Sequence, residues 1–305
     1  MIPIDMLPDE TLLSIFNFYV DYYSDEDRPT KLGAEKWQTL VHVCRRWRSI
    51  VFESPHRLNL RLFCRRTTPA KDTLDVWPAL PIMIIVARTF FGPISDIDNI
   101  ISALNHNDRV CRIELWNSFS QLETLLPVMM VPFPELTVLR FGLYNINVGR
   151  VPIIPDSFLG GSAPRLRKLQ LDFIPFPGLP KLLLSATLLV QLHLIGIPPS
   201  GYISPKEMVT CLSMLSSLES LSLQFSGHQL PPIQSSRPSE HSSLPSLTSF
   251  TFEGPGEYLE NLVACIDAPR LNELNMDFFD ETDTPQLAQF VDRTPTLGAV
   301  KGYNL

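Results

Sequence analysis

Cysteine and histidine are the side chains most able to act as nucleophiles, bases or metal ligands, and the chain carries five cysteines and six histidines. The cysteines lie at least twenty positions apart and form no C-x-x-C pair, which argues against a clustered zinc site. The sequence holds no G-x-S-x-G, H-E-x-x-H or G-x-x-x-x-G-K motif. It therefore predicts no catalytic residue, no metal and no cofactor, and we expect the protein not to be an enzyme.

Single cysteines outside any motif are weaker candidates for a catalytic nucleophile. Cys44 falls within an apolar helical stripe and is expected to be inert, whereas Cys64 is expected to be more exposed but has no activating base beside it. The odd, scattered cysteine count is typical of reduced thiols, and the N-terminus lacks the pattern of a signal peptide. These features predict a cytoplasmic or nuclear protein.

The amino-acid composition indicates which kinds of molecule the protein can bind. Hydrophobic residues make up 45% of the 305 residues, enough to bury a substantial core. The net charge of −7 argues against binding to nucleic acid, which needs a basic field. The most apolar stretch, 78–87, is too short to span a bilayer. We therefore expect a protein partner, with no role for nucleic acid or membrane.

A short pattern of proline and apolar residues repeats along most of the chain. A proline, a leucine two residues later and then two alternating apolar residues recur at 134–141, 164–171, 245–252 and 269–276. Further copies lack the proline or are partial, and equivalent positions fall 23–30 residues apart: Ile84, Ile113, Leu139, Leu169, Leu192, Leu221, Phe250, Leu274 and Val300. This spacing is typical of leucine-rich repeats, which stack parallel strands on a shared core.

The predicted fold class is α+β to α/β, with a small N-terminal helical domain before a leucine-rich-repeat solenoid that has a parallel sheet. The helical domain covers 3–60, a junction covers 61–80, and the irregular repeats cover 81–305 with a disordered insert near 230–243. Helices on the convex side are expected at 95–104, 121–130 and 204–215.

Strand periodicity predicts which side chains face a partner. If Leu169 and Leu171 point into the core, then Lys168 and Gln170 face the concave surface. The same phase gives the predicted substrate-binding set: Arg112, Glu114, Trp116, Arg140, Lys168, Gln170, His193, Gln224, Glu253, Glu273 and Asp277. Residues 251–293 contain ten acidic and two basic side chains, so we expect basic substrate groups toward the C-terminal end, with Trp116 as an aromatic anchor.

The first sixty residues contain two amphipathic helical patterns. Pro8 and Asp9 suit a helix N-terminus, and the apolar positions continue through Phe16. A second, continuous helix is expected over about 34–54. Helices this short cannot bury their own apolar surface, so the repeats or a partner must cover it.

Two blocks of this region, in the right order, resemble the F-box: Leu7-Pro8-Asp9-Glu10 with Leu12, Leu13, Ile15 and Phe16, and then Trp37, Leu40 and Val43-Cys44-Arg45-Arg46-Trp47-Arg48. The stretch 73–81 is similar to the junction of many fungal F-box proteins. The resemblance covers about a fifth of the chain, and residues 21–36 make the gap between the blocks longer than in the compact F-box.

The resemblance implies a non-catalytic substrate receptor. In that family the F-box helices dock on the Skp-type adaptor of a cullin-based ubiquitin ligase, and the downstream repeats hold a protein substrate. Carried over to this chain, the adaptor-binding residues are Leu7, Pro8, Leu12, Leu13, Ile15, Phe16, Trp37, Leu40, Val43, Cys44 and Trp47. The alternatives are a repeat scaffold that uses these helices only as a cap, and an enzyme built from scattered residues.

Overall fold

A nine-stranded parallel sheet dominates the computed structural model, which describes residues 4–21, 36–64, 70–86, 97–143, 152–227, 241–280 and 283–297. Its strands follow one another in chain order: β1 (Leu62–Cys64), β2 (Ile82–Val86), β3 (Val110–Asn117), β4 (Val138–Leu143), β5 (Lys168–Asp172), β6 (Gln191–Ile197), β7 (Ser220–Phe225), β9 (Ser249–Gly254) and β11 (Glu273–Phe278). The fold is therefore mixed α/β, as predicted at that level.

The predicted repeat positions pair with one another across the sheet. Ile84 aligns with Ile113, and the alignment continues without a gap through Leu139, Leu169, Leu192, Leu221, Phe250 and Leu274. The first seven of these side chains belong to one core cluster on one face of the sheet, and Leu274 packs against it. Apolar spacing in the sequence thus predicted the register of eight strands, because a one-residue slip would turn the apolar set away from the core.

A repeated turn precedes most strands of the sheet and often contains proline. Before β4, the Leu136 amide donates to the Phe133 carbonyl at 3.1 Å, and before β5 the Leu166 amide donates to the Ala163 carbonyl at 3.1 Å. The same hydrogen bond, from a leucine amide to the carbonyl three residues earlier, precedes β6, β7, β9 and β11. Proline occupies the second position of four of these six turns, where its fixed φ suits the turn and no amide is needed.

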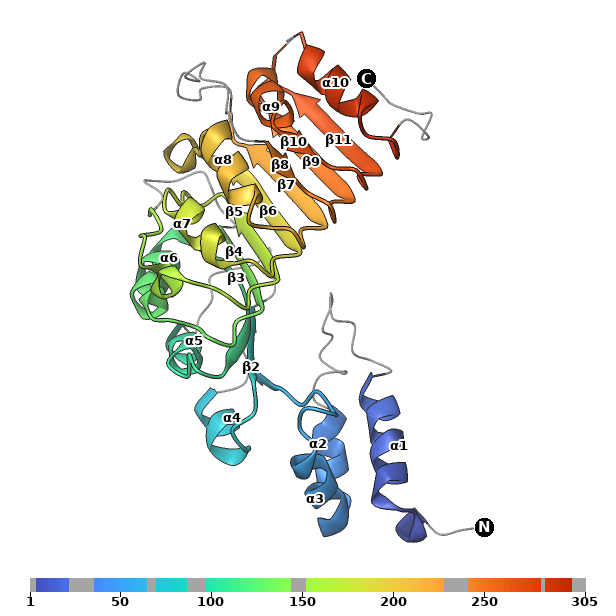
Figure 1. Cartoon of the computed structure of the whole chain (residues 1–305). Coiled ribbons are helices and arrows are strands. Elements are labelled where there is room, and N and C mark those ends of the chain that lie inside the picture. The colour runs from blue at the N-terminus through green and yellow to red at the C-terminus, as the bar shows by residue number, and fades with distance from the viewer. Residues whose placement is uncertain are drawn as a thin grey trace.

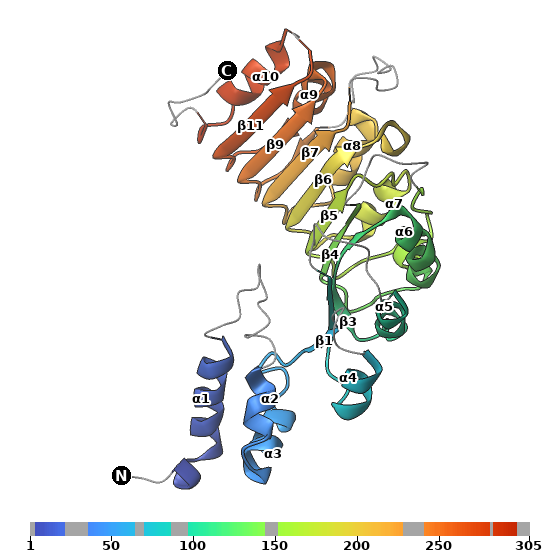
Figure 2. The same ribbon diagram turned by 180° about the vertical axis from the view of Figure 1, so that it is seen from behind.

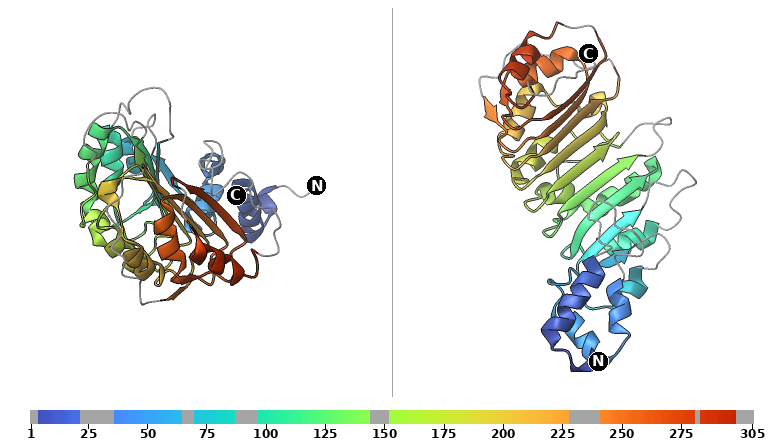
Figure 3. Two further views of the ribbon diagram at one scale, coloured as in Figure 1. Left: turned by 90° about the horizontal axis from the view of Figure 1, so that it is seen from above. Right: turned by 90° about the vertical axis from the view of Figure 1, so that its right-hand side faces the viewer.

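Helices cover one face of the sheet (Figures 1 and 2). They are α5 (Ile97–Leu104), α6 (Phe119–Leu125), α7 (Leu179–Ser185), α8 (Pro205–Leu212) and α9 (Gly256–Val263). Seen from above, the strands lie on the inner side of these helices (Figure 3), and α10 (Pro285–Asp292) packs beside α9. The predicted helices correspond to α5, α6 with the 3-10 turn Leu126–Met130, and α8; α7, α9 and α10 were not predicted.

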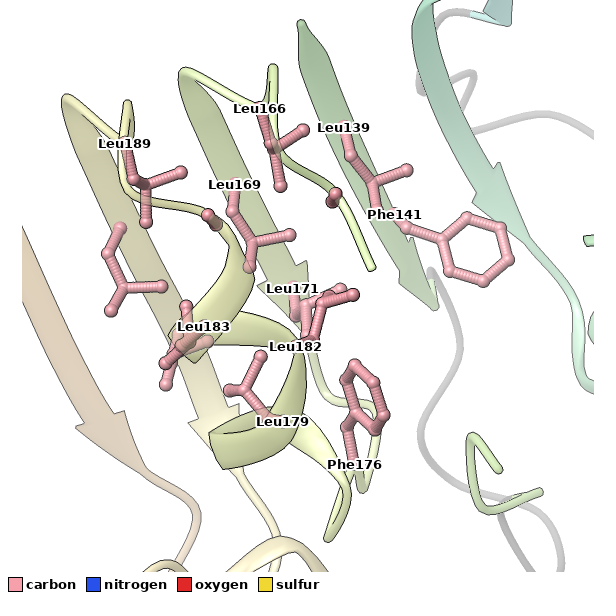
Figure 4. Close-up of a cluster of buried hydrophobic side chains, with 14 of the residues drawn as sticks. Leu139, Phe141, Leu166, Leu169, Leu171, Phe176, Leu179, Leu182, Leu183 and Leu189 are labelled. Atoms are coloured by element: carbon pink, nitrogen blue, oxygen red, sulfur yellow. The ribbon is translucent and has the colours of Figure 1, made fainter. Parts of the chain in front are cut away.

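Each repeat unit buries its strand against its helix. In the unit drawn in Figure 4, Leu169 and Leu171 of β5 meet Leu182 and Leu183 of α7. Burial of such side chains stabilises the fold by about 1.5–3 kcal/mol each. Helix ends are also specified locally: Ser204 and Glu207 form a reciprocal capping box at the start of α8, and Pro205 stands at its first turn.

Three helices lie at the N-terminal end of the sheet (Figure 1): α1 (Asp9–Asp21), α2 (Lys36–Val41) and α3 (Arg45–Glu53). The prediction of one continuous helix over about 34–54 was wrong. The helix ends after Val41, Cys44 adopts extended backbone angles, and α3 begins at Arg45. The Arg48 guanidinium donates from Nε to the Val41 carbonyl at 3.0 Å, which satisfies an acceptor that the break leaves without a helical partner.

Two predicted boundaries also differ from the structure. The predicted junction 61–80 contains β1, which joins the sheet, and α4 (Ala70–Val76). At the end of the predicted insert, β8 (Ser242–Ser243) pairs with β10 (Ile266–Asp267); residues 228–240, like Val300, lie outside the described residues. Among the described helices, none is both long and apolar enough to cross a bilayer.

Candidate protein-binding surfaces

The N-terminal helices have an apolar core of their own, which continues into the first strand. Leu12 and Phe16 of α1, Trp37 of α2 and Val51 of α3 are fully buried in it. The ring of Trp37 lies 5.0 Å from that of Trp77, edge to face, and its Nε1 donates to the Arg61 carbonyl at 3.2 Å. The helices are therefore attached to the sheet through shared burial.

Five predicted adaptor-binding residues lie inside this core, so their assignment to a free surface is corrected: Leu12, Leu13, Phe16, Trp37 and Leu40. More of the chain covers these side chains than the sequence pattern predicted. Leu58, Leu60, Leu62 and Leu80, from the segment after α3, complete the core. Leu7 and Trp47 are half-buried, and Pro8, Ile15, Val43 and Cys44 are exposed.

The two F-box-like sequence blocks contact each other. The Arg46 guanidinium donates to the Leu7 carbonyl at 2.5 Å, and its Nε donates to an Asp9 carboxylate oxygen at 3.0 Å. The Phe16 and Trp47 rings lie 4.7 Å apart. This contact sets the position of α1 on α3, despite the long gap between the blocks.

Apolar side chains remain exposed around this contact. Ile15 and Val43 are 45% and 57% exposed, and Met6, Phe18 and Tyr19 are also exposed. Met6, Phe18 and Tyr19 were not singled out from the sequence. On α1, Ile15, Phe18 and Tyr19 follow the i, i+3, i+4 spacing of a helix and extend the apolar surface beyond Leu12 and Phe16, and this periodicity could have identified them.

The other candidate surface is the sheet face that carries no helix in the described part of the chain, which we call the open face (Figure 3). Alternation along the strands brings the predicted substrate-binding residues onto it. Strand pairing aligns Glu114, Arg140, Gln170 and His193 in one row. A neighbouring row contains Gln224, Glu253 and Asp277.

Two residues expected to be exposed on this face are buried. Arg112 is 4% and Glu114 is 6% exposed, and they form an ion pair in which Arg112 Nε donates to Glu114 Oε1 at 2.6 Å. Arg140 on the next strand approaches the same carboxylate oxygen at 3.4 Å. Strand pairing places Met83 and Ile85 of β2 on one side of the pair and Val138 and Arg140 of β4 on the other. The charges of Arg112 and Glu114 are therefore largely neutralised within the protein.

Trp116 is half-buried and held in place. Its Nε1 donates to Asp172 Oδ2 at 3.3 Å, and Gln170 Nε2 donates to Asp172 Oδ1 at 3.0 Å. One strand further, the His193 Nε2 and the Ser220 hydroxyl lie 3.0 Å apart. Burial, and then the positive charges of Arg140 and Lys168, lower the pKa of His193 from its ordinary value of 6.5, although Asp172 opposes this.

The C-terminal end of the open face is acidic. Glu273 and Asp277 on β11 are exposed and Glu253 on β9 is half-buried. The apolar residues that alternate with them, Leu274 and Met276, pack against the core. The predicted change from mixed charge to acidic charge along the sheet therefore lies on one face.

The described residues contain no group of three or more histidine, cysteine, aspartate or glutamate side chains that could hold a metal ion. The expectation about the cysteines was reversed: Cys64 is buried and Cys44 is exposed. Burial raises the pKa of Cys64 and of Cys211 to about 11, which disfavours the nucleophilic thiolate.

Comparison with known families finds no family model that matches this chain, and no curated protein matches it.

Proposed function

We propose that the protein is an F-box substrate receptor of a cullin-based ubiquitin ligase, in which α1–α3 bind the Skp-type adaptor and a leucine-rich-repeat solenoid binds a protein substrate. The observation that carries the proposal is the contact between the two F-box-like blocks. Arg46 and Trp47 of the second block meet Leu7, Asp9 and Phe16 of the first. Apolar side chains remain exposed beside that contact.

The repeat units support the second half of the proposal. Units of 23–30 residues, each with a strand in register and most with a helix on one side, match the architecture of a solenoid. Solenoids present a long surface to partners, and here the open face holds mixed and acidic side chains together with Trp116.

One observation favours the alternative of a scaffold that never meets a ligase. Leu62 of β1 and Leu80, just before β2, belong to the same apolar cluster as α1–α3. The helices therefore also fit the role of a cap that shields the first strand of the sheet. This reading needs no adaptor.

Co-purification with the Skp-type adaptor distinguishes the ligase receptor from the scaffold. We expect the full chain to retain the adaptor, and we expect Ile15→Glu with Val43→Glu to weaken that binding at least about tenfold, because charges enter an apolar interface. Leu184→Glu with Met214→Glu is the matched control: these side chains are 45% and 46% exposed, Leu184 lies in α7 and Met214 follows the end of α8. No adaptor binding by the parent, or equal loss in both variants, would reject the ligase role.

A further inference from the structure

We infer that the end of the open face formed by β7, β9 and β11 binds a basic segment of the substrate protein, one that carries several lysine or arginine side chains. The inference rests on the proposed role of the repeats as the substrate-binding part of the molecule. It adds the chemical class of the bound segment and the place where it binds.

Strand register places like charges next to each other. Glu253 of β9 pairs directly with Asp277 of β11. Neighbouring strands lie about 4.8 Å apart, and like charges directly opposite each other destabilise a sheet. Glu273 adds a third carboxylate on the same face of β11, where it accepts a hydrogen bond from Asn275 at 3.1 Å.

The cations of this region do not balance these charges. Arg293 pairs with Asp267 at 3.0 Å and donates to the Ile266 carbonyl, close to β10 and α9. Arg270 lies in the turn before β11. No ion pair reaches Glu253, Glu273 or Asp277 from any residue that the structure describes. Cations supplied by a partner would relieve the repulsion.

The strands beside the acidic end carry short, neutral side chains. Going from β6 toward β11, the open face carries short hydroxyl side chains on β7 and β9: Ser220, Ser222, Ser249 and Thr251. Short side chains let another polypeptide approach the sheet closely, while the carboxylates at the far strands attract its basic groups. The complementary partner is therefore a protein segment with positive charge at this end.

Fluorescence anisotropy with a labelled peptide of alternating lysine and serine tests the inference on the full chain. We expect the parent protein to bind this peptide and to bind a glutamate–serine peptide far more weakly. The open-face variant combines Glu253→Gln, Glu273→Gln and Asp277→Asn. We expect it to bind the lysine peptide about tenfold more weakly, since three charge pairs with the peptide are removed.

The matched control removes the same charge from helices on the other face of the sheet: Glu123→Gln, Glu257→Gln and Asp292→Asn. We expect it to bind within about twofold of the parent. Equal weakening in both variants, no weakening in the open-face variant, or no binding by the parent would overturn the inference. If the triple variant does not fold, Asp277→Asn alone replaces it, with weakening of about two- to threefold expected.

Adaptor binding by the same variants keeps the two proposals apart. The open-face variant should retain the adaptor as the parent does, because its substitutions lie in β9 and β11. Loss of peptide binding with adaptor binding intact supports the inference. Failure of the parent to bind the adaptor, with selective peptide binding preserved, would reject the ligase role and leave the basic-segment surface in place.

Discussion

The indole of Trp116 on β3 reaches Asp172 on β5 across the whole width of the strand between them. Gly142 of β4 stands between the two in the same row. A Cβ at this position would lie 2.8 Å from the Asp172 Cβ and 3.2 Å from the Trp116 Cδ1. The hydrogen bond between Trp116 and Asp172 thus depends on the missing side chain of the residue that separates them.

Gly142→Ala should therefore displace the indole. We expect the free energy of unfolding to fall by about 1–3 kcal/mol, because the new methyl group overlaps both neighbours. Urea denaturation measures the loss, and tryptophan emission reports the displacement. In a Trp116→Ala background, where the indole is absent, the same glycine substitution should cost less. An unchanged midpoint and emission spectrum would show that the packing tolerates the methyl group.

Glu114→Gln should destabilise the sheet. The substitution leaves Arg112 buried without its carboxylate, and removing one partner of a buried pair typically costs about 3–5 kcal/mol. Glu123 on α6 is exposed and makes a suitable control, since Glu123→Gln should change stability by less than about 0.5 kcal/mol. Chemical denaturation of both variants checks the difference. Similar stability in the two would mean that Arg112 finds another partner.

His193 should make stability depend on pH in a defined direction. Its pKa is lowered in the folded protein, chiefly by burial, so the unfolded chain binds more protons near the ordinary value of 6.5. This contribution to stability is present above that value and is lost as the pH falls through it. We expect His193→Gln to remove this part of the pH dependence, measured as unfolding free energies between about pH 5 and pH 8.

Thiol reactivity should separate the cysteines by burial. In the native protein we expect iodoacetamide to modify Cys44 first, because it is exposed. Cys64 and Cys211 should react only after denaturation, since burial raises the pKa of both to about 11. Peptide mass spectrometry after timed labelling gives the individual rates. Modification of Cys64 as fast as Cys44 would contradict the burial described here.

The part of the fold that was predictable from the sequence depends on apolar periodicity. Ile113, Leu139 and Leu169 were recognisable as strand residues because apolar residues alternate around them and because they recur at the repeat spacing. Their alignment across the sheet follows from that spacing. The break between α2 and α3 has no such signal. Val41, Cys44 and Trp47 continue a helical stripe in the sequence. Only the structure shows the break and the hydrogen bond from Arg48 to the Val41 carbonyl that satisfies the interrupted turn.

Burial was harder to predict than position. The phase of the strands put Arg112 and Glu114 on the correct face, but the phase does not show that they bury one another. In the same way, Leu12 and Phe16 were correctly taken as one apolar face of α1. The core that covers them includes Leu62 and Leu80, which belong to the segment 61–80 that the sequence described only as a junction. Such distant contacts leave no local pattern.

The strand order has a consequence for how the molecule assembles. The order of strands in the main sheet is also their order in the chain, so strand pairing joins each unit only to the units next to it. Growth can start from any neighbouring pair of units and extend in both directions, one unit at a time. A fault in one unit would then disturb chiefly the units on either side of it.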